Sequence, residues 1–173
     1  MAFSIFTLKI ICDILFEIKV KRRASKIHET TEIDPAIQEV MDYGTYLHRM
    51  LELTDFKTKD TSFIKNENDR KLIDDILKLP ILNVNDDGIV YQEYDYYDEL
   101  LSTTGSIDLM IYNNGIYNII DYKTSNIDDP SYINQLNTYK RNVMDIFNVD
   151  KEHVKMYLLS IIQKKYKEVM DED

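Results

Sequence analysis

The sequence contains few of the residues that staple or bend small proteins. Its 173 residues include one cysteine, no tryptophan, three prolines and four glycines. Cys12 has no partner in the chain, which excludes an intrachain disulfide framework. A cysteine-based zinc centre or an iron–sulfur cluster needs several thiolates and is excluded on the same ground. Because glycine and proline are so scarce, each of them marks a turn, a helix end or a close approach.

Long apolar runs are also missing. Residues 2–20 form the most apolar stretch, but two lysines, one aspartate and one glutamate interrupt it. A membrane span needs about 20 mostly apolar residues with few or no charges. A signal peptide would need a positively charged start and a small-residue cleavage site, and neither flanks this stretch. We therefore expect a cytoplasmic protein without a membrane partner.

Positive charge is in deficit, since 31 acidic residues outnumber 21 lysines and arginines and leave a net charge of −10. This balance argues against a protein that coats nucleic acid by bulk charge, although it allows a local basic groove. The length and the 44% of apolar residues suit one globular domain. We divide the chain into an amphipathic and basic N-terminal extension, 1–28, and a single domain, 29–173. The basic end of the extension either closes a solvated helix or contacts phosphates.

Local patterns predict an α/β sheet flanked by helices. Asp34-Pro35 and Asp129-Pro130 are helix starts, and Asn114-Gly115 between apolar runs is a strong hairpin signal. The helix after Pro130 should bury Ile133, Leu136, Tyr139, Val143 and Ile146. The full set of predicted elements is a helix from Asp34 with its apolar stripe ending at Leu51, a helix over 69–79, strands over 89–97, 105–112 and 116–124, the helix from Asp129, and a buried strand over 154–162.

The predicted hairpin brings charged residues together. A two-residue turn at Asn114-Gly115 places Asp108 directly opposite Asp121, and facing residues point to the same side of a sheet. Lys123 follows on that side, because strand side chains alternate with period two. Two interpretations are open. The lysine can neutralise one aspartate in a salt-bridged cluster, or the two carboxylates can bind a hard cation such as Mg²⁺ with the lysine beside it.

Two further pairs favour the cation site. Gly44 and His48 are four residues apart on one helix face, and a helix-interior glycine, which costs about 1 kcal/mol relative to alanine, indicates close approach of the helix to the sheet. Gln135 and Tyr139 have the same spacing on the helix after Lys123. Taken singly, His48 and Tyr139 read as core residues and Gln135 as a solvated one.

In this order, four motifs resemble those of a known family. They are Gly44-x-x-x-His48, Gly105-Ser106-Ile107-Asp108, Asp121-Tyr122-Lys123-Thr124 and Gln135-x-x-x-Tyr139. The set is similar to the nuclease domain of the RecB/AddA type within the PD-(D/E)XK superfamily, over roughly residues 24–162. The resemblance implies a restriction-endonuclease-like fold, with a central mixed sheet that contains an antiparallel hairpin. It also implies a metal-dependent deoxyribonuclease, expected to be an exonuclease in double-strand break processing and recombinational repair.

The resemblance assigns roles residue by residue. It implies that His48, Asp108, Asp121 and the backbone carbonyl of Tyr122 bind Mg²⁺ or Mn²⁺. Lys123 would orient or activate the attacking water and contact the phosphate of the DNA. Further roles would fall to Glu93 as an acidic catalytic residue on the preceding strand, with Asp95 and Glu99 as alternatives, and to Gln135 and Tyr139 in positioning DNA. Since imidazole suits transition metals, we expect Mn²⁺ to support activity at least as well as Mg²⁺.

Two departures from the family pattern narrow the resemblance. Related nucleases with an iron–sulfur cluster hold it with four cysteines, so this chain resembles the cluster-free branch. That branch normally follows a helicase, but no Gly-x-x-x-x-Gly-Lys-Ser/Thr phosphate-binding motif is present here. A separate helicase subunit is therefore a candidate partner. The alternatives to a nuclease are a non-catalytic DNA-binding or scaffold module of a helicase–nuclease complex, and an α/β domain with an incidental ionic cluster.

Overall fold

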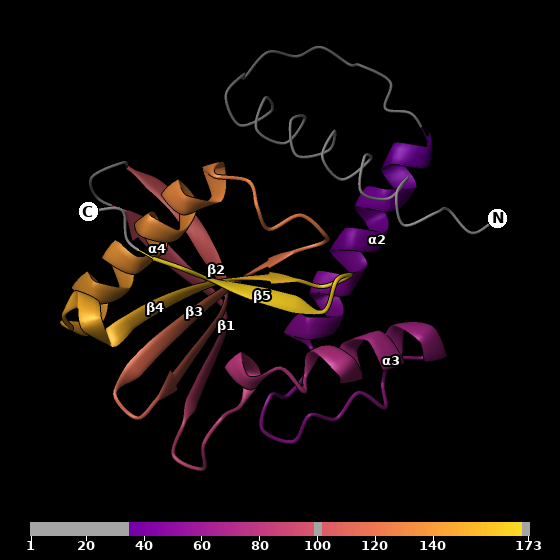
Figure 1. Ribbon diagram of the computed structural model, residues 1–173, viewed down its shortest axis with the longest axis horizontal. Coiled ribbons are helices and arrows are strands. Elements are labelled where there is room, and N and C mark those ends of the chain that lie inside the picture. Colours follow the sequence, from indigo (N-terminus) through magenta and orange to yellow (C-terminus); the bar gives the residue numbers. More distant parts are fainter. Residues whose placement is uncertain (1–34, 99–101, 171–173) are drawn as a thin grey trace.

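The predicted α/β architecture is confirmed. A computed structural model describes residues 35–98 and 102–170, in which a five-stranded mixed sheet lies between helices (Figure 1). The predicted extension 1–28 and the helix-start residue Asp34 lie outside the described residues. None of the described helices is long and apolar enough to cross a membrane. The elements are α2 (Pro35–Glu52), α3 (Glu67–Ile76), a 3-10 turn (Pro80–Leu82), β1 (Ile89–Asp98), β2 (Thr103–Asn113), β3 (Ile116–Lys123), α4 (Ser131–Phe147), a second 3-10 turn (Lys151–His153), β4 (Val154–Ser160) and β5 (Lys165–Val169).

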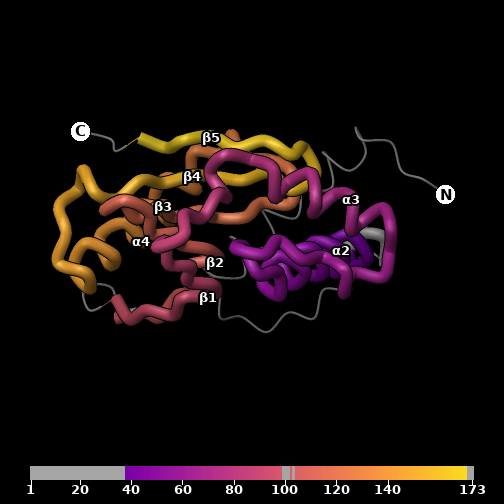
Figure 2. Tube along the Cα trace, turned by 90° about the horizontal axis from the view of Figure 1, so that it is seen from below, coloured from indigo at the N-terminus to yellow at the C-terminus, as the bar shows by residue number. Residues whose placement is uncertain are grey.

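The strands lie in the sheet in the order in which they follow one another along the chain, β1-β2-β3-β4-β5 (Figure 2). All neighbours are antiparallel except β3 and β4, which are parallel and are connected through α4. The apolar β4 lies inside the sheet, as its sequence predicted. The edge strand β5 was not predicted, because four of its five residues are exposed and its sequence, Lys-Tyr-Lys-Glu-Val, has no apolar alternation.

The hairpin register is the predicted one. Asn114 and Gly115 both have positive φ, 50° and 84°, as a two-residue turn of type I′ requires. Tyr112 faces Tyr117, and the pairing continues in register to Leu109 and Ile120. The next position along the ladder is that of Asp108 and Asp121.

Each face of the sheet has its own core. The α2-side core is formed by Leu47, Leu51, Phe56, Ile64, Ile73, Ile76, Leu77, Leu82, Leu109, Ile111, Ile120, Tyr122, Tyr157, Leu159 and Ile161. The α4-side core is formed by Ile107, Met110, Ile119, Ile127, Tyr132, Leu136, Tyr139, Val143, Val154, Met156, Leu158 and Val169. One prediction for α4 is wrong. Ile146 is 48% exposed, and the buried stripe of the helix runs instead through Tyr132, Leu136, Tyr139 and Val143, which places Ile146 beyond its edge.

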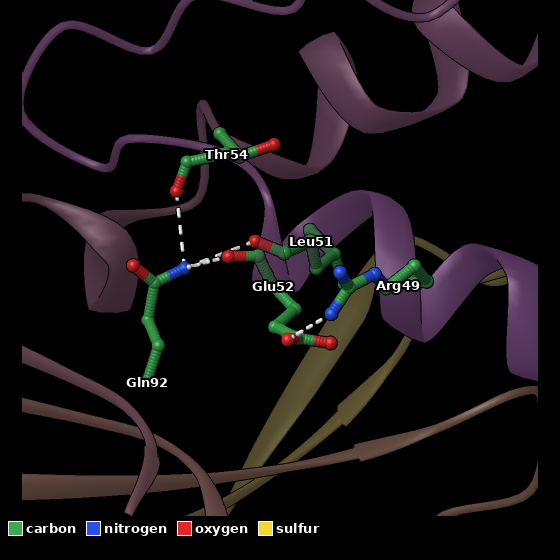
Figure 3. A network of polar contacts seen from close by, with 5 residues as sticks. All are labelled: Arg49, Leu51, Glu52, Thr54 and Gln92. Carbon is green, nitrogen blue, oxygen red and sulfur yellow. Dashed lines mark hydrogen bonds and ion pairs between the residues drawn. The ribbon is translucent and has the colours of Figure 1, made fainter.

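A glutamine of β1 holds the end of α2. The side-chain amide of Gln92 donates to the carbonyl oxygens of Leu51, Glu52 and Thr54 at 3.2, 2.7 and 3.1 Å (Figure 3). These carbonyls belong to the last turn of the helix and the residues after it, where intrahelical donors are missing. An amide nitrogen is suited to this position, since it supplies two hydrogens to several acceptors. Gln92 thus fixes the end of α2 to the outer strand of the sheet.

Replacing Gln92 by leucine should lower the free energy of unfolding by roughly 1–3 kcal/mol, because it leaves carbonyl groups at the end of α2 without their donor. Urea unfolding of the full chain measures this change. Gln163→Leu is the matched control, since the side chain of Gln163 is exposed. Equal stability of the two variants would show that Gln92 does not hold the helix end.

Candidate active site

The regular pairing of the sheet is interrupted at one row of acidic residues. Between β1 and β2 the ladder pairs Gln92 with Leu109 and then Tyr94 with Ile107, so that Glu93 and Asp108 face each other without pairing. Between β2 and β3 the pairing ends at Leu109, again just before Asp108. Asp108 therefore lies at a break in the ladder on both of its sides.

Side-chain alternation shifts at this break. Tyr91 and Tyr94 are three residues apart in β1, yet both rings contact Phe147 of α4, at 5.6 and 6.1 Å between ring centroids. In β2, Ile107 and Leu109 are two residues apart but belong to opposite cores. In a regular strand, residues three apart point to opposite faces and residues two apart point to the same face. Glu93 has φ of 47°, a left-handed conformation that costs of order 1–3 kcal/mol outside glycine and is concentrated at functional sites.

Asp108 is largely buried at the end of the ladder. One of its carboxylate oxygens accepts a hydrogen bond of 2.6 Å from the backbone N–H of Tyr122 and so takes the place of a strand carbonyl. Burial raises the pKa of Asp108 to about 8, and the neighbouring charge of Asp121 adds to this effect. The Tyr122 N–H and the ammonium group of Lys123 act in the opposite direction on the pKa of Asp108.

Asp121 begins a chain of polar contacts that leads to α4. Its side chain is 2% exposed and forms an ion pair of 2.5 Å with Lys123 Nζ. The same ammonium group donates to Gln135 Oε1 at 3.3 Å, and Gln135 Nε2 donates to the Tyr139 hydroxyl at 2.5 Å. The structure thus brings together Asp108, Asp121, Lys123, Gln135 and Tyr139, although this proximity does not test their roles.

Lys123 also lies over an aromatic ring that sequence reasoning missed. Its Nζ is 4.1 Å from the ring centroid of Tyr132, within range of a cation–π interaction. Tyr132 precedes Gln135 by three residues on α4, so both reach the lysine from one helix face. That spacing was readable from the sequence, but an aromatic residue on a buried helix stripe gives no signal beyond core packing.

Helix α2 approaches β3 closely, as Gly44 predicted. A Cβ atom on Gly44 would lie 2.8 Å from the hydroxyl oxygen of Thr124, so a larger residue would displace the helix or the threonine. One turn later, His48 packs its ring edge-on against Tyr122, with 5.6 Å between the ring centroids. The Tyr122 ring is part of the α2-side core, whereas Lys123 contacts α4. His48 therefore approaches β3 from the opposite face to Lys123.

Glu93 is turned toward the end of α2. Its side chain is exposed at the surface, and the partial burial of the carboxyl group raises its pKa, with further contributions from the charges of Glu52 and Asp95. Arg49 acts to lower the pKa of Glu93. The charges that act on Glu93 thus come from Glu52 and Arg49 of α2 and from Asp95 of β1 itself. Of the alternatives to Glu93, Asp95 is exposed and Glu99 lies outside the described residues.

The donors in this row fit a hard divalent cation. The carboxyl groups of Asp108 and Asp121 lie side by side, and burial together with the charge of Asp121 raises the pKa of Asp108. A bound proton or a bound cation reduces the repulsion within such a pair. Carboxylate oxygens and the Tyr122 carbonyl are ligands that Mg²⁺ and Mn²⁺ accept. Over residues 35–98 and 102–170, no group of three or more His, Cys, Asp or Glu side chains is arranged to hold a metal ion, so His48 as a third ligand stays a prediction.

Comparisons with known proteins add no relative. No protein-family model matches the sequence, and no curated protein matches it. The family resemblance therefore depends on the four sequence motifs alone.

In metal-free protein, the raised pKa of Asp108 should make stability depend on pH. Because the folded-state pKa, about 8, exceeds the ordinary value of 3.8, this contribution is complete below about pH 4 and is lost as the pH rises through 8. Urea unfolding in EDTA should therefore give a free energy of unfolding that falls between pH 5 and 8. Asp108→Asn should remove most of this slope, and an unchanged slope in the variant would contradict the assignment.

Proposed function

We propose that this protein is a metal-dependent deoxyribonuclease of the RecB/AddA type. The observation that carries the proposal is the juxtaposition of Asp108 and Asp121 at the end of the β2–β3 ladder, with Lys123 paired to Asp121. A strained backbone at Glu93 in the same row supports a functional rather than an incidental ionic cluster, because an incidental cluster gives no reason for the strain to be retained.

The chain's own residues account for binding and orientation. Asp108 and Asp121 would hold Mg²⁺ or Mn²⁺ together with the Tyr122 carbonyl, and His48 is the remaining candidate ligand. When bound, such a metal activates water and neutralises charge on a phosphodiester. The Tyr122 N–H fixes the Asp108 carboxylate at 2.6 Å, so little reorganisation is needed on binding.

Lys123 is placed to serve both the carboxylates and a phosphate. Its ammonium group lies between Asp121, Gln135 and the Tyr132 ring, and its side chain remains 16% exposed. A phosphate oxygen that replaces one of these contacts gains a charge-assisted hydrogen bond. Gln135, linked to Tyr139, then holds the lysine and contacts the DNA strand beside the scissile bond.

The cellular role that we propose is end processing of DNA breaks, with exonuclease action and a separate helicase subunit as partner. A helicase would supply unwound strands to such a nuclease, and these residues contain no phosphate-binding motif of a helicase. This role follows from the family resemblance, and the DNA fragments released in the cleavage assay test it.

The proposal predicts that purified full-length protein degrades end-labelled DNA with Mg²⁺ or Mn²⁺ and not with EDTA. Asp121→Ala and Lys123→Ala should each lower the cleavage rate at least a hundredfold, since each removes a charged group at the site. The measurement is product release from labelled single- and double-stranded DNA, which also reports exo- or endonuclease action.

The matched controls for these variants are Asp145→Ala and Lys151→Ala, which remove the same charges from exposed positions on α4 and on the 3-10 turn before β4. Circular dichroism establishes that all four variants are folded. Cleavage by both site variants at the wild-type rate would refute the nuclease assignment.

Metal binding separates a nuclease from a non-catalytic scaffold module. Calorimetric titration with Mn²⁺ should show a site that is lost in Asp108→Asn and Asp121→Asn, because both carboxylates are needed to hold the cation. Retention of the site in Asp145→Asn is the control. Absence of Mn²⁺ binding by the wild-type protein, together with EDTA-insensitive DNA binding, would favour the scaffold.

A further inference from the structure

Edge strand β5 carries two lysines on the same side of the sheet as Lys123. Val169 of β5 belongs to the α4-side core, and Lys167 and Lys165 precede it by two and four residues. Side chains at this spacing share one face of a strand. Lys167 confirms the orientation, since its ammonium group lies 3.7 Å from Asp128 in the segment that leads into α4. Both lysine side chains are exposed.

The register places these lysines level with the candidate active site. Lys123 of β3 faces Ser160 of β4, and Ser160 faces Lys165 of β5. One step further along the ladder, Asp121 and Lys167 both face Leu158. Neighbouring strands are about 4.8 Å apart, so each β5 lysine has its Cα about 10 Å from the corresponding residue of β3.

The two lysines form few ion pairs with acidic residues. Lys165 has no ion pair among the described residues, and Lys167 has only its long contact with exposed Asp128. Lys164 differs, because it turns to α3 and binds Asp75 at 2.7 Å. In a chain where 31 acidic residues outnumber 21 basic ones, two lysines on the active-site face that share a single long ion pair are not a consequence of composition.

We propose that Lys165 and Lys167 bind backbone phosphates of a single DNA strand that leaves the active site across β4. The inference rests on the proposed nuclease function and extends it to the path of the substrate. The hydroxyl of Ser160 donates to the Ser125 carbonyl at 2.5 Å, so the segment that begins at Ser125 covers β4 on this face, and the DNA strand would have to pass over that segment. Ammonium groups that contact phosphates give binding without sequence preference, which suits an enzyme that degrades DNA from its ends.

A second explanation for the lysines is protection of a sheet edge against pairing with another chain. Edge protection requires charge anywhere along β5, and Glu168 on the opposite face would serve equally well. Phosphate binding requires the charge to be positive and on the face of Lys123. The two explanations therefore differ in what Lys→Ala substitutions do to DNA binding.

The test is fluorescence anisotropy of a labelled single-stranded oligonucleotide with the full chain, in EDTA to prevent cleavage and over a series of salt concentrations. Lys165→Ala/Lys167→Ala should weaken binding roughly tenfold at low salt. It should also reduce the slope of log affinity against log salt by about 1.4, because each single-strand phosphate contact contributes about 0.7. Lys165→Arg/Lys167→Arg should retain wild-type affinity.

The matched control is Lys71→Ala/Lys151→Ala, which removes the same charge from exposed positions away from β5 and should leave the binding unchanged. Equal losses in the two alanine variants, no loss in either, or no DNA binding by the wild-type protein would each overturn the inference.

The cleavage assay separates this inference from the proposed function. In the Lys165→Ala/Lys167→Ala variant, the DNA concentration for half-maximal rate should rise while the rate at saturation stays unchanged. An unchanged half-saturating DNA concentration in that variant would refute the role of the two lysines and would leave the proposed nuclease function intact. If the wild-type protein binds DNA through these lysines but does not cleave it, the nuclease function is refuted and the DNA-binding surface stands.

Discussion

When both are ionised, Asp108 and Asp121 repel each other across the end of the hairpin, and burial strengthens this repulsion by lowering the local dielectric constant. A separate contact stabilises the charged form of each carboxyl group. Asp108 accepts the Tyr122 N–H, whereas Asp121 is paired with Lys123. The hydrogen bond to Asp108 requires the β2–β3 ladder to end where it does, because in a continued ladder the Tyr122 N–H would donate to a strand carbonyl. The break in the sheet and the placement of the charges are therefore parts of one arrangement.

The two helical layers are positioned by contacts near this break. On one face, the glycine in α2 permits close approach to Thr124, and Gln92 fixes the end of the same helix to β1. On the other face, α4 supplies the amide and the ring that surround Lys123. The chain thus places rigid elements, rather than loops, on both sides of the carboxylates. Side chains on such elements hold their geometry better than side chains on loops.

Much of this arrangement could be predicted from local sequence. Asn114-Gly115 determines a two-residue turn, and that turn determines which residues of β2 and β3 face each other. The shift in alternation at Glu93 could not be predicted, because period-two reasoning assumes an uninterrupted ladder. The strand β5 escaped prediction for a related reason, since its pairing with β4 and not its own apolar content makes it a strand. The position of His48 depends on helix packing, which a single helical pattern does not encode.

With the exception of His48, the candidate active-site residues all lie between Glu93 and Tyr139, a continuous stretch that contains β2, β3 and the first half of α4. The hairpin within this stretch needs only local contacts, whereas the parallel pairing of β3 with β4 must wait until α4 has been traversed. During synthesis, the two aspartates can therefore come face to face before β4 is available to pair with β3. The folding order of the chain then brings these two carboxyl groups together at an early stage, when solvent and dissolved ions can still reach them freely.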